Sequence, residues 1–200
     1  MITKIKTLSK TVIALVVFSF VLASCKKDDD SIAPLDVQNE SAVVGTINTT
    51  VVNGNYGNPA SGPAAFGTKY FNIATGAQDS VGVIAYHLLF TSTNNGTISP
   101  RSGYTLKYLN TTKALSAIAP ADYTAATTVT SLTRNTSTTT TANGWWNYDL
   151  TTHVVSATPN VVLFVRVGTV TYAFKCTNAA GQGSATSNRG VYTFQYGVVN

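Results

Sequence analysis

The chain has 200 residues and a formal net charge of +5, and this length suits a single domain once a processed N-terminal segment is removed. Three of its lysines lie in that segment, so the chain from Cys25 onward has ten basic and eight acidic residues, a net charge of +2. No cluster of lysine or arginine remains to follow a phosphate backbone, which argues against nucleic acid as a partner.

Residues 1–24 predict a lipoprotein signal peptide. A basic start is formed by Lys4, Lys6 and Lys10. The apolar run at residues 12–23 is shorter than the ~20 residues that span a bilayer, and it ends in Leu22-Ala-Ser-Cys25, which resembles a bacterial lipobox. Cys25 would then be acylated and would anchor the chain in the membrane. The alternative is an ordinary secretory signal followed by a chance cysteine.

Residues 25–40 predict a flexible tether. The run Lys26-Lys-Asp-Asp-Asp30 is short and charged and cannot bury apolar surface. It also resembles the lysine-plus-acid signals that carry lipoproteins to the outer face of some Gram-negative envelopes. We therefore expect a lipid-anchored protein of the outer membrane that faces the cell exterior, with residues 41–200 forming a single β domain.

The first half of this domain has short strand-like runs separated by turns. Residues 53–67 are rich in glycine and proline and predict a long loop that could act as a lid or a binding loop. Asn94-Asn-Gly96 is a strong hairpin signal. The strands expected here are residues 41–52, 68–73, 81–90, 104–109 and 114–118.

The second half contains the only candidate for a helix, residues 120–132, although their threonines and valines favour strand. Residues 134–141 are polar and of low complexity and predict a mobile loop. Residues 181–190 predict a loop of small residues before the last strand. The remaining strand-like runs are residues 144–148, 153–155 and 190–196.

The densest run of β-branched and aromatic residues is 160–177, and Gly168 divides it into the two arms of a hairpin. The first arm hardly alternates, which indicates a central strand covered on both faces. Cys176 has no partner once Cys25 is acylated, so we expect a buried free thiol. Many short threonine-rich strands with little helix predict an all-β fold, a mainly antiparallel sandwich or an open barrel.

The order of several short motifs resembles the HmuY-type haem-binding lipoproteins, which are envelope-anchored haemophores with a mostly β fold. The motifs are Lys69-Tyr-Phe-Asn-Ile-Ala-Thr-Gly76, Gly144-Trp-Trp-Asn-Tyr148, His153-Val-Val, Leu163-Phe-Val-Arg166 and Gly190-Val-Tyr-Thr-Phe194, behind the lipobox and the acidic tether. The resemblance covers residues 68–196. It implies a surface lipoprotein that binds haem or a related porphyrin and hands it to an outer-membrane transporter.

The chain departs from the family pattern in two places. Tyr86-His-Leu-Leu-Phe90 stands where relatives often have Trp-Asp-aliphatic-small-Phe, and Val167-Gly-Thr169 stands where they often have a glycine turn with an acidic residue. Family members that grip haem do so through pairs of histidines or methionines on loops. The chain after the signal peptide has no methionine, so imidazole is the ligand to consider first.

His87 and His153 are the two residues whose imidazole could bind haem iron, and no other metal site is predicted. His87 lies in a strand-like run where a core or edge histidine is also common, and His153 lies beside a turn where a structural hydrogen bond would also suit it. Tyrosine could replace one ligand. Trp145 and Trp146 should point to opposite faces of a strand, so at most one can stack on a porphyrin or a sugar ring. Otherwise both are packing residues.

The sequence shows no grouping of residues for catalysis. Asp79 and Asp149 are too isolated to act as an acid–base pair, and there is no phosphate-binding glycine loop, no serine–histidine–aspartate set and no cluster of metal ligands. We therefore expect a protein that is not an enzyme. The alternative to haem binding is a surface adhesion or structural module that meets glycans or proteins.

Overall fold

The computed structural model describes residues 43–200. The predicted signal peptide (1–24), the predicted lipid-attachment site Cys25 and the tether (25–40) lie outside the described residues. The fold is all-β with mostly antiparallel sheets, and these sheets are not closed into a barrel, as in a β-sandwich. The all-β prediction is therefore confirmed.

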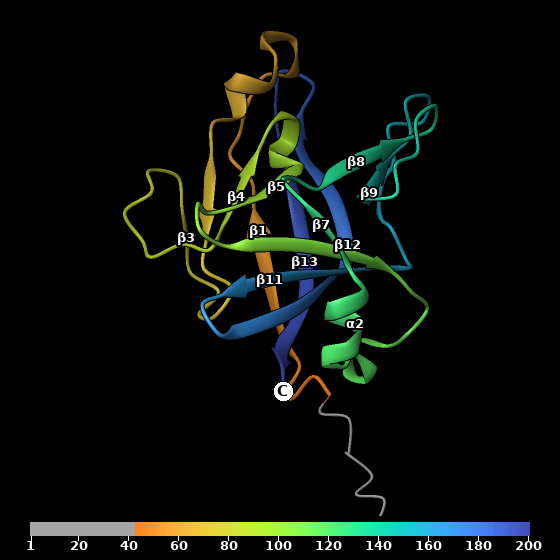
Figure 1. Ribbon diagram of the computed structural model, residues 1–200. Coiled ribbons are helices and arrows are strands. Elements are labelled where there is room, and N and C mark those ends of the chain that lie inside the picture. Colours follow the sequence, from red (N-terminus) through yellow and green to blue (C-terminus); the bar gives the residue numbers. More distant parts are fainter. Residues whose placement is uncertain (1–42) are drawn as a thin grey trace, which may run out of the picture. The chain divides into compact units, whose positions relative to one another are not determined.

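Residues 43–200 form three sheets (Figure 1). The six-stranded sheet has the order β1 (Asn48–Asn53), β13 (Ser187–Val199), β12 (Val170–Ser184), β11 (Val161–Val167), β6 (Thr105–Asn110) and β7 (Thr127–Val129). The four-stranded sheet has the order β3 (Gln78–Asp79), β2 (Lys69–Phe71), β4 (Leu88–Thr91) and β5 (Thr97–Pro100). The small sheet has the order β10 (Val155–Ala157), β9 (Gly144–Tyr148) and β8 (Thr133–Thr136), and β8 and β9 are parallel.

The expected central hairpin is formed by β11 and β12, which join at Gly168 with φ 61°. β11 lies between β12 and β6, and its first five residues, 161–165, are all buried. Val161, Leu163 and Val165 face one hydrophobic cluster, while Val162 and Phe164 face another. Burying each of these side chains contributes about 1.5–3 kcal/mol. The prediction of a strand covered on both faces is confirmed.

The two clusters lie on opposite faces of the six-stranded sheet. The larger one fills the space toward the four-stranded sheet and β9, and its largest members are Phe71, Phe90, Trp145, Trp146, Phe174, Tyr192 and Phe194. The smaller one is covered by η4 (Leu115–Ala117) and the short helix α2 (Pro120–Ala125), which Figure 1 shows beside β11. The centre of the six-stranded sheet is therefore covered on both faces and forms a middle layer.

Residues 181–190 were expected to form a loop, and this prediction is wrong. The β12–β13 ladder continues through this segment to the pair Ser184 and Ser187. Its small residues lower the strand signal, but the ladder is made by backbone groups, which glycine and serine supply as well as any residue. A register shift between Cys176 and Asn178 marks a β-bulge, which lets so long a strand bend.

Three further segments, residues 114–118, 120–132 and 134–141, differ from expectation. The expected strand 114–118 is instead the single turn η4, and the expected helix 120–132 ends at Ala125 because the chain then joins β6 as β7. Residues 134–141 were expected to be loop throughout, but β8 pairs with β9 as far as Thr136. Residues 53–67 do form the predicted connection, with the turns η1 (Pro59–Ser61) and η2 (Pro63–Phe66).

Residues 81–90 are strand only from Leu88. The preceding segment is held in an irregular conformation by the carboxylate of Asp79. That carboxylate accepts four backbone N–H groups, from Val81 (2.9 Å), Gly82 (2.6 Å), Val83 (3.0 Å) and Ile84 (2.9 Å). These donors cannot also join a sheet ladder, which explains why the apolar run does not become a strand.

Candidate functional site

Trp145 and Trp146 lie in β9 with both side chains fully buried. The pairing of β8 with β9 shifts by one residue just before Arg134, which faces Trp146, so Trp145 is the extra residue of a β-bulge. A bulge places two successive side chains on one strand against one partner. For this reason the two rings do not alternate between opposite faces, as the sequence alone led us to expect.

Both indole groups bind the same backbone oxygen. The Nε1–H groups of Trp145 and Trp146 donate to the carbonyl of Gly96 at 3.1 Å and 2.9 Å. A Cβ at residue 96 would lie 2.3 Å from Cζ2 of Trp146, so only glycine allows this approach. Trp145 also packs against Tyr192, with ring centroids 4.7 Å apart. The tryptophans are packing residues here, and neither presents an exposed ring for stacking.

The turn η3 (Thr93–Asn95) joins β4 to β5, as the Asn-Asn-Gly signal predicts. Three non-glycine residues at this turn have left-handed backbone conformations: Ser92 (φ 67°), Asn94 (φ 58°) and Asn95 (φ 54°). Asn95 is fully buried, and its amide donates to the carbonyls of Gly67 (3.0 Å) and Phe90 (2.9 Å). Backbone strain of this kind persists only where surrounding contacts enforce it. The turn is therefore rigid.

A pocket of about 190 Å³ lies between this turn and β8. It is lined by Ser92, Thr93, Gly96, Thr97, Thr133, Arg134 and Trp146. Trp146 is fully buried, so it closes the floor from beneath, while Arg134 and the hydroxyl residues are partly exposed. We call this the Arg134 pocket. It lies in part on residues that the sequence assigned to a mobile loop.

His153 has a structural role at the turn between β9 and β10. Its backbone is left-handed, with φ 58°, and its N–H donates to the carbonyl of Asp149 at 2.9 Å. Its Nδ1 lies 2.7 Å from the hydroxyl of Tyr148. The expected alternative, a structural hydrogen bond, is therefore present.

His87 lies in the segment that leads into β4, and it is partly buried. Its Nδ1 is buried and has no hydrogen-bond partner among residues 43–200. The ring lies 5.7 Å from that of Tyr104, edge on, and is stacked at 6.2 Å from that of Tyr172. Burial, and then the positive charge of Arg101, lower the pKa of His87 below its ordinary value of 6.5. The imidazole is thus neutral at neutral pH.

The surface around His87 is rich in aromatic rings. Tyr86 lies 4.8 Å from Tyr70, and the guanidinium of Arg101 lies 5.1 Å from the centre of the Tyr86 ring. Val81 and Val83, in the segment held by Asp79, are 76% and 82% exposed, and a Cβ at Gly82 between them would lie 2.9 Å from Cζ of Tyr70. We call this set the His87 surface: Tyr70, Val81, Val83, Tyr86, His87, Arg101, Tyr104 and Tyr172.

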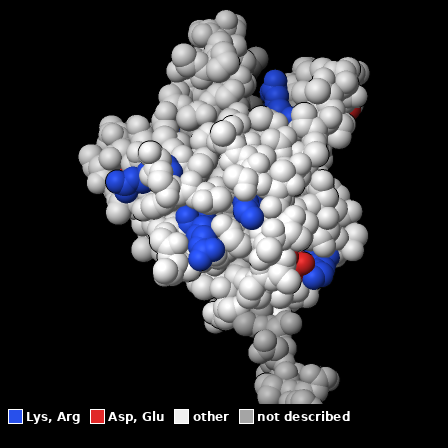
Figure 2. Space-filling view, viewed as in Figure 1, with Lys and Arg blue, Asp and Glu red and all other residues white. Residues whose placement is uncertain are grey.

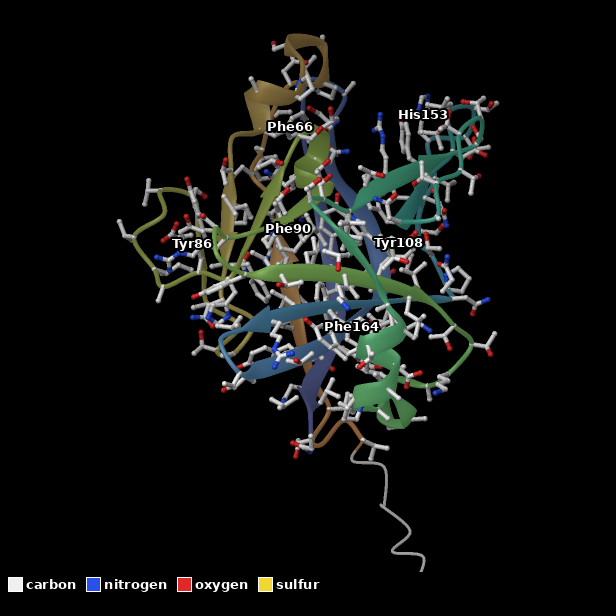
Figure 3. The ribbon with its side chains drawn as sticks, viewed as in Figure 1. Phe66, Tyr86, Phe90, Tyr108, His153 and Phe164 are labelled. Carbon is white, nitrogen blue, oxygen red and sulfur yellow. The ribbon has the colours of Figure 1, made fainter. Side chains whose placement is uncertain are left out.

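The two histidines do not meet in one site. Figure 3 shows Tyr86, the neighbour of His87, and His153 on opposite sides of the view. His87 is anchored in the four-stranded sheet, because its N–H donates to the carbonyl of Phe71 at 2.8 Å, whereas His153 belongs to the small sheet. A pair of imidazoles from this one domain cannot clamp one iron atom in this conformation.

All three aspartates of residues 43–200 are engaged by backbone N–H groups. Asp79 binds the four donors named above, Asp122 accepts from Ala119 (2.8 Å), and Asp149 accepts from Thr151 (2.8 Å) and Thr152 (2.7 Å). These bonds from Thr152 and Thr151 lower the pKa of Asp149 below its ordinary value. Each carboxylate thus orders a turn, and no two of them form an acid–base pair.

The same residues hold an excess of positive charge, with eight lysines and arginines against three aspartates. Figure 2 shows the basic side chains at several separate places on one face and only small acidic areas. The part of the chain that the structure describes contains no group of three or more histidine, cysteine or acidic residues that could hold a metal ion. Within the same part, no helix has the length and apolarity to cross a membrane.

Comparisons of the chain with protein-family models, with curated proteins and with solved structures find no match. The likeness to HmuY-type lipoproteins therefore rests on the sequence motifs quoted above. Of the four residues singled out for haem, the structure places two in the core, one in a turn and one in an aromatic surface.

Sequence reasoning missed two features of the site. Arg134 was passed over because the threonine-rich segment behind it looked like a mobile loop, although a lone arginine before a tryptophan-rich strand was the available signal. Asp79 was considered only as a catalytic group. Its place directly before Ser-Val-Gly, where small residues let several N–H groups converge, was the signal for a capped turn.

Proposed function

We propose that this chain is a non-catalytic surface lipoprotein that binds haem or a related porphyrin at the His87 surface and passes it to an outer-membrane transporter. The observation that carries the proposal is the buried Nδ1 of His87, which has no hydrogen-bond partner among the described residues. A buried polar atom left unpaired costs stability and needs an explanation, and an imidazole held in place for a function is one. Because Nδ1 is buried, Nε2 is the nitrogen that would ligate iron.

The chemistry of the His87 surface suits a porphyrin in three respects. The imidazole of His87 is neutral because its pKa is lowered, and the neutral form is the one that ligates iron. Tyr104, Tyr172 and the exposed valines offer apolar and aromatic surface to the macrocycle. The guanidinium of Arg101 can pair with a propionate carboxylate.

His87 would hold the haem iron, and His153 would not join it. Because His153 is bound to Tyr148 in a separate sheet, any further ligand would come from a tyrosine of the His87 surface or from a partner. The protein's own part is to present His87 in a fixed orientation, which its stacking on Tyr172 supports. Holding haem through one imidazole would also suit a protein that must release it.

A haemin titration of residues 31–200, followed by absorbance, tests this function. We expect a shifted and saturable Soret band that is lost or weakened at least tenfold in His87→Ala and unchanged in His153→Ala, the matched control. Loss of the Soret shift in His153→Ala alone would show that the ligand is His153 of the small sheet, and would contradict the proposal. A Soret band that does not shift at micromolar haemin would refute haem binding altogether.

A surface adhesion module that meets glycans is the second candidate. The observation in its favour is the Arg134 pocket, which is polar, rigid and too small for a porphyrin. Its hydroxyl groups suit a sugar better than they suit an apolar macrocycle.

A further inference from the structure

The Arg134 pocket is formed by two segments that contacts elsewhere hold in place. One wall is the turn from Ser92 to Gly96, and the other is the start of β8, at Thr133 and Arg134. The turn is fixed by the buried amide of Asn95 and by the two indole N–H groups on the Gly96 carbonyl. A preformed pocket loses little conformational entropy when a ligand binds, which favours affinity.

Arg134 brings a positive charge to this pocket that no carboxylate in the described part of the chain neutralises. The ion pair found within residues 43–200 is that of Lys113 with Asp122, and it lies elsewhere. Asp79 and Asp149 are occupied by backbone N–H groups. On one side the guanidinium of Arg134 lies 5.6 Å from the centre of the Tyr148 ring, which helps to orient it. Its planar fork is free to bind an anion.

The other polar groups of the pocket are hydroxyls. Within residues 43–200, the hydroxyls of Ser92, Thr93 and Thr97 make no hydrogen bond to another group of the chain, and that of Thr133 has a weak contact with Thr141 at 3.4 Å. A hydroxyl can both donate and accept, so these groups match the hydroxyls of a sugar. A phosphate offers mainly acceptors, and its sites are usually built from converging backbone N–H groups or several cations.

The size of the pocket limits the ligand to one small ring. Its volume of about 190 Å³ is below the ~300–1,000 Å³ of sites for drug-sized ligands. The buried ring of Trp146 forms the floor and so cannot stack on a second ring. One monosaccharide unit therefore fits better than an extended chain.

We propose that the Arg134 pocket binds an acidic monosaccharide, that is, a sugar ring that carries a carboxylate. Arg134 takes the carboxylate in a bidentate pair, and the hydroxyls of Ser92, Thr93 and Thr97 exchange hydrogen bonds with the ring hydroxyls. This inference deepens the adhesive candidate function and does not depend on haem binding. The sugar could be free or could be the end of a glycan.

Isothermal titration calorimetry of the full chain in a non-ionic detergent tests the proposal, with D-glucuronate as the probe. D-glucose lacks the carboxylate, inorganic phosphate is a simple anion, and methyl β-D-glucuronide resembles a glycan end. We expect glucuronate to bind at least tenfold more tightly than glucose or phosphate. Equal binding of the methyl glycoside would indicate a glycan end as the source, and its exclusion would indicate the free sugar acid.

Two substitutions locate the binding. Arg134→Gln should weaken glucuronate binding at least tenfold, and Arg134→Lys should restore only part of it, because lysine cannot form the bidentate pair. Arg189→Gln is the matched control, since Arg189 stacks on Tyr56 outside the pocket. If Arg134→Gln folds normally, as judged by circular dichroism, and binds glucuronate as the parent does, the proposal is overturned.

The haemin and glucuronate assays test separate proposals, so a negative result in one does not affect the other. Phosphate binding as tight as glucuronate binding would overturn the sugar assignment and leave a simple anion site. His87→Ala should leave glucuronate binding unchanged, and Arg134→Gln should leave the Soret shift unchanged. A loss of both ligands in either variant would contradict the separation of the two sites, which share no lining residue.

Discussion

The imidazole of His87 is stacked on the phenol ring of Tyr172, with their centroids 6.2 Å apart and their planes inclined by 27°. Tyr172 belongs to β12 of the six-stranded sheet, whereas His87 leads into β4 of the four-stranded sheet. The contact therefore joins the two larger sheets. It also places a titratable ring where its protonation affects the packing of both layers.

The stability of the domain should depend on His87 between about pH 7.5 and pH 5. The pKa of His87 lies below 6.5 in the folded state, while in the unfolded chain it is near 6.5. As the pH falls through this window the unfolded chain binds the proton first, so the free energy of unfolding decreases. Carboxylates do not contribute there, because the pKa values of all three aspartates are lowered from 3.8.

Urea unfolding at about pH 7.5 and at about pH 5 measures how the free energy of unfolding depends on pH. His87→Gln should lose most of the pH dependence, and His153→Gln should keep it. Equal pH dependence in the parent and in His87→Gln would show that the imidazole is solvated in the folded state.

Asp79 should control the order of the segment that presents Val81 and Val83. Burial opposes its ionisation, but hydrogen bonds from Gly82, Ile84 and their neighbours outweigh this and lower the pKa of the carboxyl below 3.8. In Asp79→Ala we expect hydrogen exchange of amides 81–84 to speed up by about an order of magnitude or more. Asp149→Ala, which removes a comparable cap elsewhere, is the control. Unchanged exchange in Asp79→Ala would mean that the segment orders itself.

The contact between Gly96 and Trp146 should tolerate no side chain at residue 96. A Cβ there would lie 2.3 Å from Cζ2 of Trp146, so Gly96→Ala should lower the free energy of unfolding by about 1–3 kcal/mol or more. The displaced indole should also shift its fluorescence to longer wavelength. For Gly181→Ala, where the nearest atom would be Val155 Cγ2 at 4.0 Å, we expect a change within about 0.5 kcal/mol. Equal effects of the two substitutions would contradict this packing.

The fold class and the central hairpin could be predicted because local sequence carries them. β11 is apolar at every one of residues 161–165, and such a run is buried on both faces whatever the rest of the chain does. The β12–β13 ladder beyond residue 180 could not be predicted in this way. There, pairing with a partner strand overrides the weak preference of glycine and serine for loops.

The candidate sites depend on contacts between distant residues and were less predictable. His87 could be named as an imidazole, but its stacking on Tyr172 joins positions 85 residues apart in the sequence. The bulge at Trp145 reverses the expected alternation of the two tryptophans, and no local signal marks it. The Arg134 pocket exists because a turn at residues 92–96 meets β8, which only the tertiary structure shows.

The lipobox prediction can be tested without reference to the fold. Cys25→Ala should move the protein from the membrane fraction to the soluble fraction and should abolish incorporation of labelled palmitate, because the acyl chains supply the stable anchoring. Cys25→Ser is a closer match in size and should behave in the same way. Palmitate that is still incorporated in either variant would show that residue 25 is not the acylation site.

Cys176 should be inert to thiol reagents while the domain is folded. Its side chain is 3% exposed, and burial raises the pKa of its thiol to about 12. At about pH 8 the reactive thiolate should therefore be at least ~1,000-fold scarcer than for a free cysteine with a pKa of ~8.5.

In a chain that begins at residue 31, Cys176 is the one cysteine, so labelling with a coloured disulfide reagent reports on it alone. We expect labelling to follow unfolding in urea, and to be faster in Gly96→Ala than in Gly181→Ala because the former opens the core more often. Rapid labelling of the folded parent would show that β12 separates from its neighbours without global unfolding, in conflict with a core closed by Phe174 and Phe194.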